Sequence, residues 1–180
     1  MTDYAQHGSE EFPHIYQKGS EQYNFVRYDL ARSAVNPEID WIIVSHHLQK
    51  YAFTQENILP GADEWSGAYH PLFGEYNVDL VLQGNQHNYQ RTFPINYNKV
   101  VTNQPNVTDR NIINYSDPSG QIFATVGTAG AQLHDLDWKA PYISTQHIGY
   151  GFLEIGIIDK GRILNATFYA NDGSIKDQLW

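Results

Sequence analysis

Two short apolar runs, separated by a predicted helix, constrain the fold of this chain most strongly. The first is WIIVS, Trp41 to Ser45, and the second is VDLVL, Val78 to Leu82. Both are short and rich in β-branched or aliphatic residues, so each predicts a strand that is buried on both faces. Parallel strands are usually buried in this way. YHPLFGEY, from Tyr69 to Tyr76, predicts a short helix between them. Strand, helix and strand in this order indicate a parallel pair within an α/β fold.

Regular patterns on both sides of this unit are consistent with one domain. Ser20 is a candidate N-cap for a helix that ends before Pro37. Residues 96–119 are polar and dense in Asn and Thr, which predicts a surface excursion. The later runs QIFATVG, GYGFLEIGII and ILNATFYAND predict strands, and the turn at Lys160 and Gly161 predicts an antiparallel hairpin. A length of 180 residues suits a single domain with its own core.

Composition excludes several classes of partner and site. The formal net charge is -9 and no cluster of Lys and Arg occurs, which argues against binding to nucleic acid or to an anionic membrane. No apolar run is long enough to cross a bilayer, and the first residues, MTDYAQHGSEEF, do not resemble a signal peptide. The chain has no cysteine, so disulfides and thiolate metal sites are excluded.

Three histidines follow the two predicted strands. His46 and His47 stand at the end of the first run, and His87 follows the second. The carboxyl ends of parallel strands meet at one edge of a sheet, where ligands bind in open α/β folds. Neutral imidazole is the commonest metal ligand near physiological pH. The spacing therefore indicates a candidate metal site, with hydrogen-bonded loop histidines as the alternative for His46 and His47.

The sequence around these histidines resembles a known family. DWIIVSHH is followed by HPLFGEYNVDLVLQGNQHNYQRTFP, and both segments are similar to the calcineurin-like metallophosphoesterases, in particular the purple acid phosphatase group. In that family V-x-x-H is followed by V-D-L-V-[LF]-x-G-H-x-H-x-Y-x-R-T-x-P. Residues 44–47 match the first motif and residues 78–94 match the second; GSEQYNFVRYDL, FATVGTAG and YGFLEI are also similar. The resemblance implies the C-terminal half of a metallophosphoesterase β-sandwich flanked by helices, with residues 1–180 as a single partial domain.

The resemblance also implies metal ligands. Enzymes of this kind hold two metals ~3.5–4 Å apart that clamp phosphate and activate water. His47 matches a ligand of one metal and His87 a ligand of the other, and iron, zinc or manganese would suit them. Asn85 occupies the first histidine of G-H-x-H, and an amide oxygen is a weaker ligand for these metals. His46 is a further weak candidate.

Tyr89 and Arg91 match the Y-x-R of the family motif, so the resemblance makes them candidates for substrate binding. A guanidinium can grip phosphate oxygens through two parallel hydrogen bonds. It can equally hold a loop by bonding backbone carbonyls, and for Arg91 we favour this structural role.

Motifs that supply the other ligands in the family are absent from the sequence. D-x-[GH], G-D-x-x-Y and G-N-H-[DE] do not occur upstream of the two matched segments, where the family has them. A catalytic metal usually needs about three protein ligands and an open position. We therefore expect that this chain alone does not assemble the binuclear centre. Asp135 and Asp137 lie outside the matched motifs, and we expect them to be solvated or turn-forming.

Three functions are compatible with these features. The first is a degenerate family member that acts as a binding or assembly module, at an extracellular or cell-surface location by resemblance. The second is one half of a split metal-dependent phosphomonoesterase that another chain completes. The third is a metal-free domain whose Tyr, Trp and Asn side chains bind carbohydrate or another surface. A partial sandwich would expose an apolar sheet edge or face, so we expect a homo-oligomer or a second chain that covers it.

Overall fold

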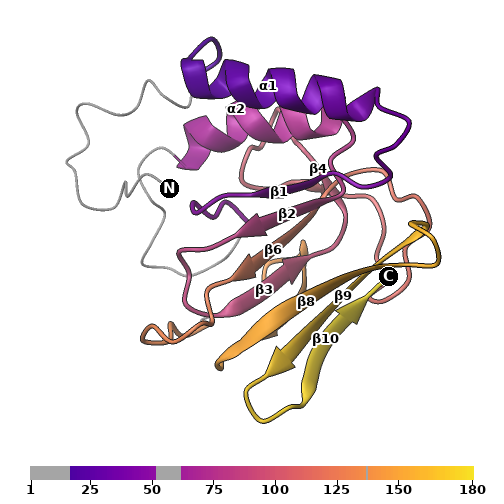
Figure 1. Ribbon diagram of the computed structural model, residues 1–180. Helices are drawn as coiled ribbons and strands as arrows, with labels where there is room; N and C mark the ends of the chain where they lie inside the picture. Colours follow the sequence, from indigo (N-terminus) through magenta and orange to yellow (C-terminus); the bar gives the residue numbers. More distant parts are fainter. Residues whose placement is uncertain (1–16, 52–61, 137) are drawn as a thin grey trace.

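The computed structural model describes residues 17–51, 62–136 and 138–180 (Figure 1). The helices are α1 (Glu21–Ala34) and α2 (Ala62–Glu75). The strands are β1 (Ile43–Ser45), β2 (Leu80–Gln83), β3 (Tyr89–Thr92), β4 (Ile95–Asn96), β5 (Asn106–Val107), β6 (Ile122–Val126), β7 (Ile143–His147), β8 (Gly151–Ile158), β9 (Ile163–Ala170) and β10 (Ile175–Leu179).

A five-stranded mixed sheet is the centre of the fold. Its strand order is β1-β2-β6-β3-β7. β1 and β2 are parallel, with Val44 opposite Val81, and β6 runs parallel to β2. The parallel pair predicted from the sequence is therefore confirmed. Because these three strands run the same way, their carboxyl ends lie at one edge, formed by residues 46–48, 84–88 and 127–129 and called the rim below.

Both helices cover one face of this sheet (Figure 1). The Ser20 hydroxyl accepts a hydrogen bond from the Tyr23 N–H, 3.1 Å away, which confirms the predicted N-cap of α1. Helix α2 begins before Tyr69, the start that the sequence predicted. The earlier turns belong to the helix because Trp65 and Ala68 are buried and continue the inward face formed by Tyr69, Leu72 and Phe73. The core between helices and sheet contains Tyr23, Leu30, Tyr51, Trp65, Ala68, Tyr69, Leu72, Phe73, Val78, Val81, Ile95 and Phe123.

The three-stranded antiparallel sheet, in the order β10-β9-β8, covers the opposite face (Figure 1). The turn between β8 and β9 has positive φ angles at Asp159, Lys160 and Gly161, of 52°, 58° and 92°, and it confirms the predicted hairpin. The core between the two sheets contains Leu80, Ile122, Ala124, Leu164, Ala166 and Leu179. The result is an α/β sandwich with helices on its outer face, as the family resemblance implied.

Five of the described strands, β3, β4, β5, β7 and β10, were not predicted. β3, β7 and β10 carry Gln, Thr, Ser, Lys and Asp side chains rather than an apolar alternation. All four residues of β3 are nevertheless buried, between β6 and β7. The polar stretch 96–119 also carries β5, which pairs with β4. No helix in the described residues is long and apolar enough to cross a membrane.

Candidate functional site

The rim brings His47 beside the turn that follows β2. The His46 N–H donates to the Leu82 carbonyl at 3.0 Å, and the Gly84 N–H donates to the His47 carbonyl at 3.1 Å. These bonds extend the pairing of β1 and β2 beyond both strands. A Cβ atom on Gly84 would lie 3.2 Å from His47 Nδ1. Asn85 directly follows Gly84, so the chain places two of its candidate ligands at adjoining backbone positions.

Asn85 has a left-handed backbone conformation, with φ of 64°. Asparagine is one of the few residues apart from glycine that adopts this region readily. The turn is packed closely against the end of β6, because a Cβ atom on Gly127 would lie 1.8 Å from the Gln86 carbonyl oxygen. Residues 84–88 are therefore held in a tight turn whose path depends on Gly127.

His87 is oriented by two contacts from the loop after β6. Its Nδ1 lies 2.7 Å from the Gln132 carbonyl oxygen, and its ring stacks on the His134 ring with centroids 4.1 Å apart. A carbonyl oxygen only accepts hydrogen bonds, so Nδ1 carries the proton and the Nε2 lone pair faces elsewhere. Sequence reasoning missed His134, although it stands next to Asp135 in a segment noted for its carboxylates.

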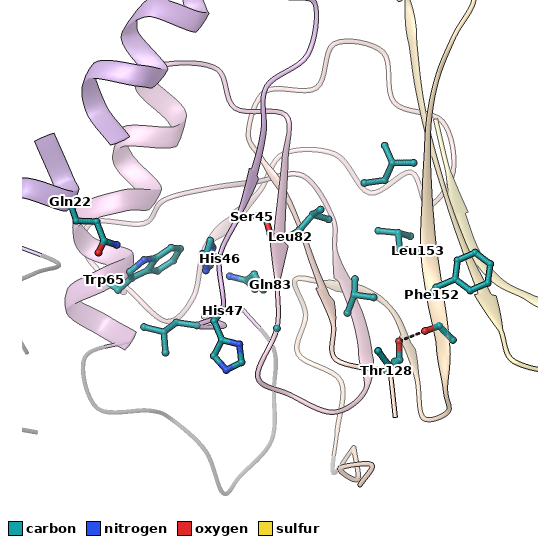
Figure 2. Close-up of a pocket in the computed structure, with 16 residues that line it drawn as sticks. Gln22, Ser45, His46, His47, Trp65, Leu82, Gln83, Thr128, Phe152 and Leu153 are labelled. Carbon is teal, nitrogen blue, oxygen red and sulfur yellow. Dashed lines mark hydrogen bonds between the residues drawn. The ribbon is translucent and has the colours of Figure 1, made fainter. Parts of the chain in front are cut away.

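His46 lies away from His47, on the helix side of the sheet. Its ring contacts Trp65 of α2, with centroids 4.2 Å apart, and Figure 2 shows His47 pointing away from this pair. Burial lowers the pKa of His46 to about 4, and the Leu48 backbone offsets this only in part. Within the described chain, neither ring nitrogen has a hydrogen bond of good geometry. His46 is thus a neutral, packed imidazole, and its role as a weak metal ligand stays a prediction.

Tyr89 and Arg91 lie inside the sandwich, bonded to Asp177 of β10. Arg91 donates from Nε and Nη2 to the two Asp177 oxygens, at 2.5 and 2.9 Å, and the Tyr89 hydroxyl donates to Oδ2 at 2.7 Å. Arg91 also bonds the Tyr115 hydroxyl and the Ile112 carbonyl. Burial alone would raise the pKa of Asp177, but the Arg91 guanidinium holds it below its ordinary value. Contact of Tyr89 and Arg91 with substrate stays a prediction.

The donor set at the rim does not fit a binuclear metal centre by itself. In residues 17–51, 62–136 and 138–180, no group of three or more His, Cys, Asp or Glu side chains is placed to hold a metal. His47, His87 and the Asn85 amide fall short of the roughly three protein ligands that each catalytic metal needs. Asp135 is exposed, and Asp137 lies outside the described residues.

A cavity of about 760 Å³ opens at the rim between β1, β2, β6 and β8 (Figure 2). Its walls include His46, His47, Gln83 and Leu153, and none of its described lining residues is Asp, Glu, Lys or Arg. Gln83 is 4% exposed, and its Nε2 has no hydrogen-bond partner in the part of the chain that is described. The described lining therefore offers no Lys or Arg side chain to a phosphate ion.

Comparisons with known proteins agree with this geometry. No family model matches the chain. It is 31% identical, over 92% of its own length, to "Probable inactive purple acid phosphatase 1" of Arabidopsis thaliana, and 26% identical, over 91%, to "Purple acid phosphatase 21" of the same plant. It spans only 27% and 35% of those relatives. A solved purple acid phosphatase from yellow lupin seeds shares the fold, with a TM-score of 0.73 and 24% identity, over 91% of this chain and 28% of that one.

Proposed function

Since the chain is a purple acid phosphatase-like metallophosphoesterase region and corresponds to the C-terminal part of that domain, we propose that it is a degenerate member acting as a binding or assembly module. It has no binuclear-metal phosphatase activity by itself. The observation that carries the proposal is Asn85, which stands beside His47 where the family motif has a histidine ligand. An amide oxygen there weakens the metal site that His47 would share.

Two further observations support the proposal. The described residues lack a third ligand for either metal, so the shortage extends beyond Asn85. A relative that matches nearly the whole chain is itself named a probable inactive purple acid phosphatase. We include in the proposal an extracellular or cell-surface location and association with a second copy or another chain, which the resemblance favours.

A hydrolysis assay tests the absence of activity. The chain is incubated with para-nitrophenyl phosphate and with Fe³⁺, Zn²⁺ or Mn²⁺, alone and in pairs. The matched control is the double variant His47→Ala, His87→Ala, which lacks both candidate imidazole ligands. We expect equal rates for the two proteins. Metal-dependent hydrolysis by the wild-type chain that the double variant loses would overturn the proposal.

A second candidate, one half of a split phosphomonoesterase, is favoured by the orientation of His87. Its Nδ1 proton is engaged by a backbone carbonyl, the arrangement that leaves Nε2 ready to bind a metal. Another polypeptide carrying D-x-[GH], G-D-x-x-Y and G-N-H-[DE] would supply the missing ligands, and His47 and His87 would complete them. In such a reconstituted pair, Asn85→His should raise phosphate release. An unchanged rate would count against this candidate.

A further inference from the structure

We propose that Asn106 and Asn114 carry N-linked glycans and that Asn165 does not. The inference rests on the proposed extracellular or cell-surface location and adds a modification to it. All three asparagines stand in an Asn-x-Ser/Thr sequence in which x is not proline, the sequence that the glycan transferase of the secretory pathway recognises. The surroundings of the three side chains differ, and the assignment follows from that difference.

Asn106 lies at the surface in β5. This strand of two residues pairs with β4, with Asn106 opposite Asn96. The Asn106 side chain is exposed and makes no hydrogen bond to another described residue. The Thr108 hydroxyl, which completes the recognition sequence, donates to the Pro94 and Ser119 carbonyls. Because folding engages this hydroxyl, we expect the glycan to be attached before the segment folds.

Asn114 is exposed in a loop whose backbone is fixed on both sides. The Trp180 N–H donates to the Ile113 carbonyl at 2.9 Å, and the Tyr115 N–H donates to the Trp180 carbonyl at 2.7 Å. The Tyr115 side chain turns inward, where its hydroxyl accepts from Arg91. The Asn114 side chain makes no hydrogen bond within the described chain. A glycan here therefore displaces no described side-chain contact.

Asn165 lies in β9, the central strand of the three-stranded sheet. Its Nδ2, the atom that would carry the glycan, donates to the Leu179 carbonyl of β10 at 3.2 Å. Its Oδ1 accepts from the hydroxyl of Thr167, which is buried. A bulky group on Nδ2 would crowd the β10 backbone to which this atom is bonded. We therefore expect this third recognition sequence to stay unmodified.

The segment with the two proposed sites exposes pairs of neighbouring apolar side chains. Val100 and Val101 are 90% and 39% exposed, and Ile112 and Ile113 are 54% and 41% exposed. Apolar groups that gather at a surface favour aggregation or contact with a partner. An N-linked glycan is bulky and solubilising, so glycans on this segment would shield these side chains.

This segment also lies away from the open edges of β1 and β8. β4 is bridged to Gln121 at the start of β6, whereas the rim lies beyond the end of β6. The neighbours of Asn114 bond Trp180, which directly follows β10, and β10 is at the opposite edge of its sheet from β8. The exposure of both sites thus does not depend on what pairs with β1 or β8.

Attachment of the glycan is a group transfer without oxidation or reduction. The asparagine Nδ2 attacks the anomeric carbon of an N-acetylglucosamine at the end of a lipid-pyrophosphate-linked oligosaccharide. The C–N bond forms as the C–O bond to the pyrophosphate breaks. The lipid pyrophosphate leaves with the bonding electrons, and Nδ2 gives up one proton.

Secretion from eukaryotic cells tests the assignment. The full chain of 180 residues is expressed behind a cleavable signal sequence, and peptide N-glycosidase then converts each linked asparagine to aspartate. Peptide mass spectrometry locates the converted residues, and we expect them to be Asn106 and Asn114. Asn106→Gln and Asn114→Gln should each remove one glycan, seen as one step in gel mobility. Asn165→Gln is the control and should remove none.

Two substitutions test the role of the recognition sequence. Thr108→Ser keeps the hydroxyl and should keep the glycan on Asn106, whereas Thr108→Ala should lose it. An unmodified Asn106 or Asn114, or a glycan on Asn165, in the secreted wild-type chain would overturn the assignment.

The proposed function fails in other ways. If the protein in its own cells lacks glycans while the secreted chain carries them, the proposed location is wrong and the assignment of the sites stands. Metal-dependent phosphatase activity would overturn the proposed absence of activity, whatever glycans the chain carries.

Discussion

Arg91 of β3 and Asp177 of β10, which are 86 residues apart, form a buried ion pair that joins the two sheets of the sandwich. Two hydrogen bonds connect the side chains directly, and Tyr89 and Thr145 donate to the same carboxylate. The pair is therefore a fully hydrogen-bonded link between the central sheet and the C-terminal strand. It explains why a polar strand such as β3 lies in the core.

Removing one partner of this pair should be costly. Arg91→Ala leaves the Asp177 carboxylate buried without its counter-charge, and we expect the free energy of unfolding to fall by about 3–5 kcal/mol. Urea denaturation measures the change. Arg162→Ala is the control, because Arg162 pairs with Asp159 at the exposed turn and should contribute less than about 1 kcal/mol. Similar losses for both variants would contradict the structural role of the buried pair.

Acid should destabilise the fold through His70. Its ring is buried, with Nδ1 2.7 Å from the Tyr51 hydroxyl, and burial lowers its pKa to about 4. The unfolded chain, with a histidine pKa of about 6.5, binds the proton first, so stability falls as the pH drops from about 6.5 to about 4. At about pH 5 this group should cost about 2 kcal/mol relative to neutral pH.

The variant His70→Gln tests this pH dependence. It has no titrating group at position 70. Between about pH 7.5 and about pH 5, its unfolding free energy should therefore fall by about 2 kcal/mol less than that of the wild type. His46, whose pKa is also lowered to about 4, contributes equally in both proteins. Urea denaturation at the two pH values measures this change in unfolding free energy for both proteins. An identical change in the two proteins would show that His70 does not remain neutral in the folded protein.

Gly127 should not tolerate a side chain. A Cβ atom there would overlap the Gln86 carbonyl, so Gly127→Ala must displace the turn that carries His87 and should cost more than about 2 kcal/mol. Gly74→Ala, in helix α2, is the matched control, because its nearest atom would be 3.9 Å away. This second variant should stabilise the protein by up to about 1 kcal/mol. Thermal unfolding of both variants measures the difference, and a stable Gly127→Ala protein would refute the close contact.

Restoring the histidine of the family motif should strengthen metal binding. In Asn85→His, imidazole replaces an amide beside His47, and histidine tolerates the left-handed backbone at this position. We expect the zinc dissociation constant, measured by calorimetry, to fall at least about tenfold. The gain should vanish when His47→Ala is added, because the two rings would share one metal. An equal gain without His47 would mean that the new histidine binds zinc elsewhere.

The sequence by itself determined the parts that depend on neighbouring residues. The apolar runs predicted the β1 and β2 strands, Ser20 predicted the start of α1, and Lys160 and Gly161 predicted the hairpin turn. The positions of His47 and His87 at the rim followed, since strand direction places the ends of parallel strands together. These signals are local: a strand, a cap and a turn each need only a few adjacent residues.

Only the tertiary structure decided which polar residues are buried and what they contact. Arg91 and Asp177 meet because β3 and β10 approach from distant parts of the chain, and His134 stacks on His87 because the loop after β6 returns to the rim. The separation of His46 from His47, one packed against Trp65 and the other exposed, depends equally on where α2 lies. Burial and pairing across long sequence distances depend on packing, which a local pattern of residue types does not encode.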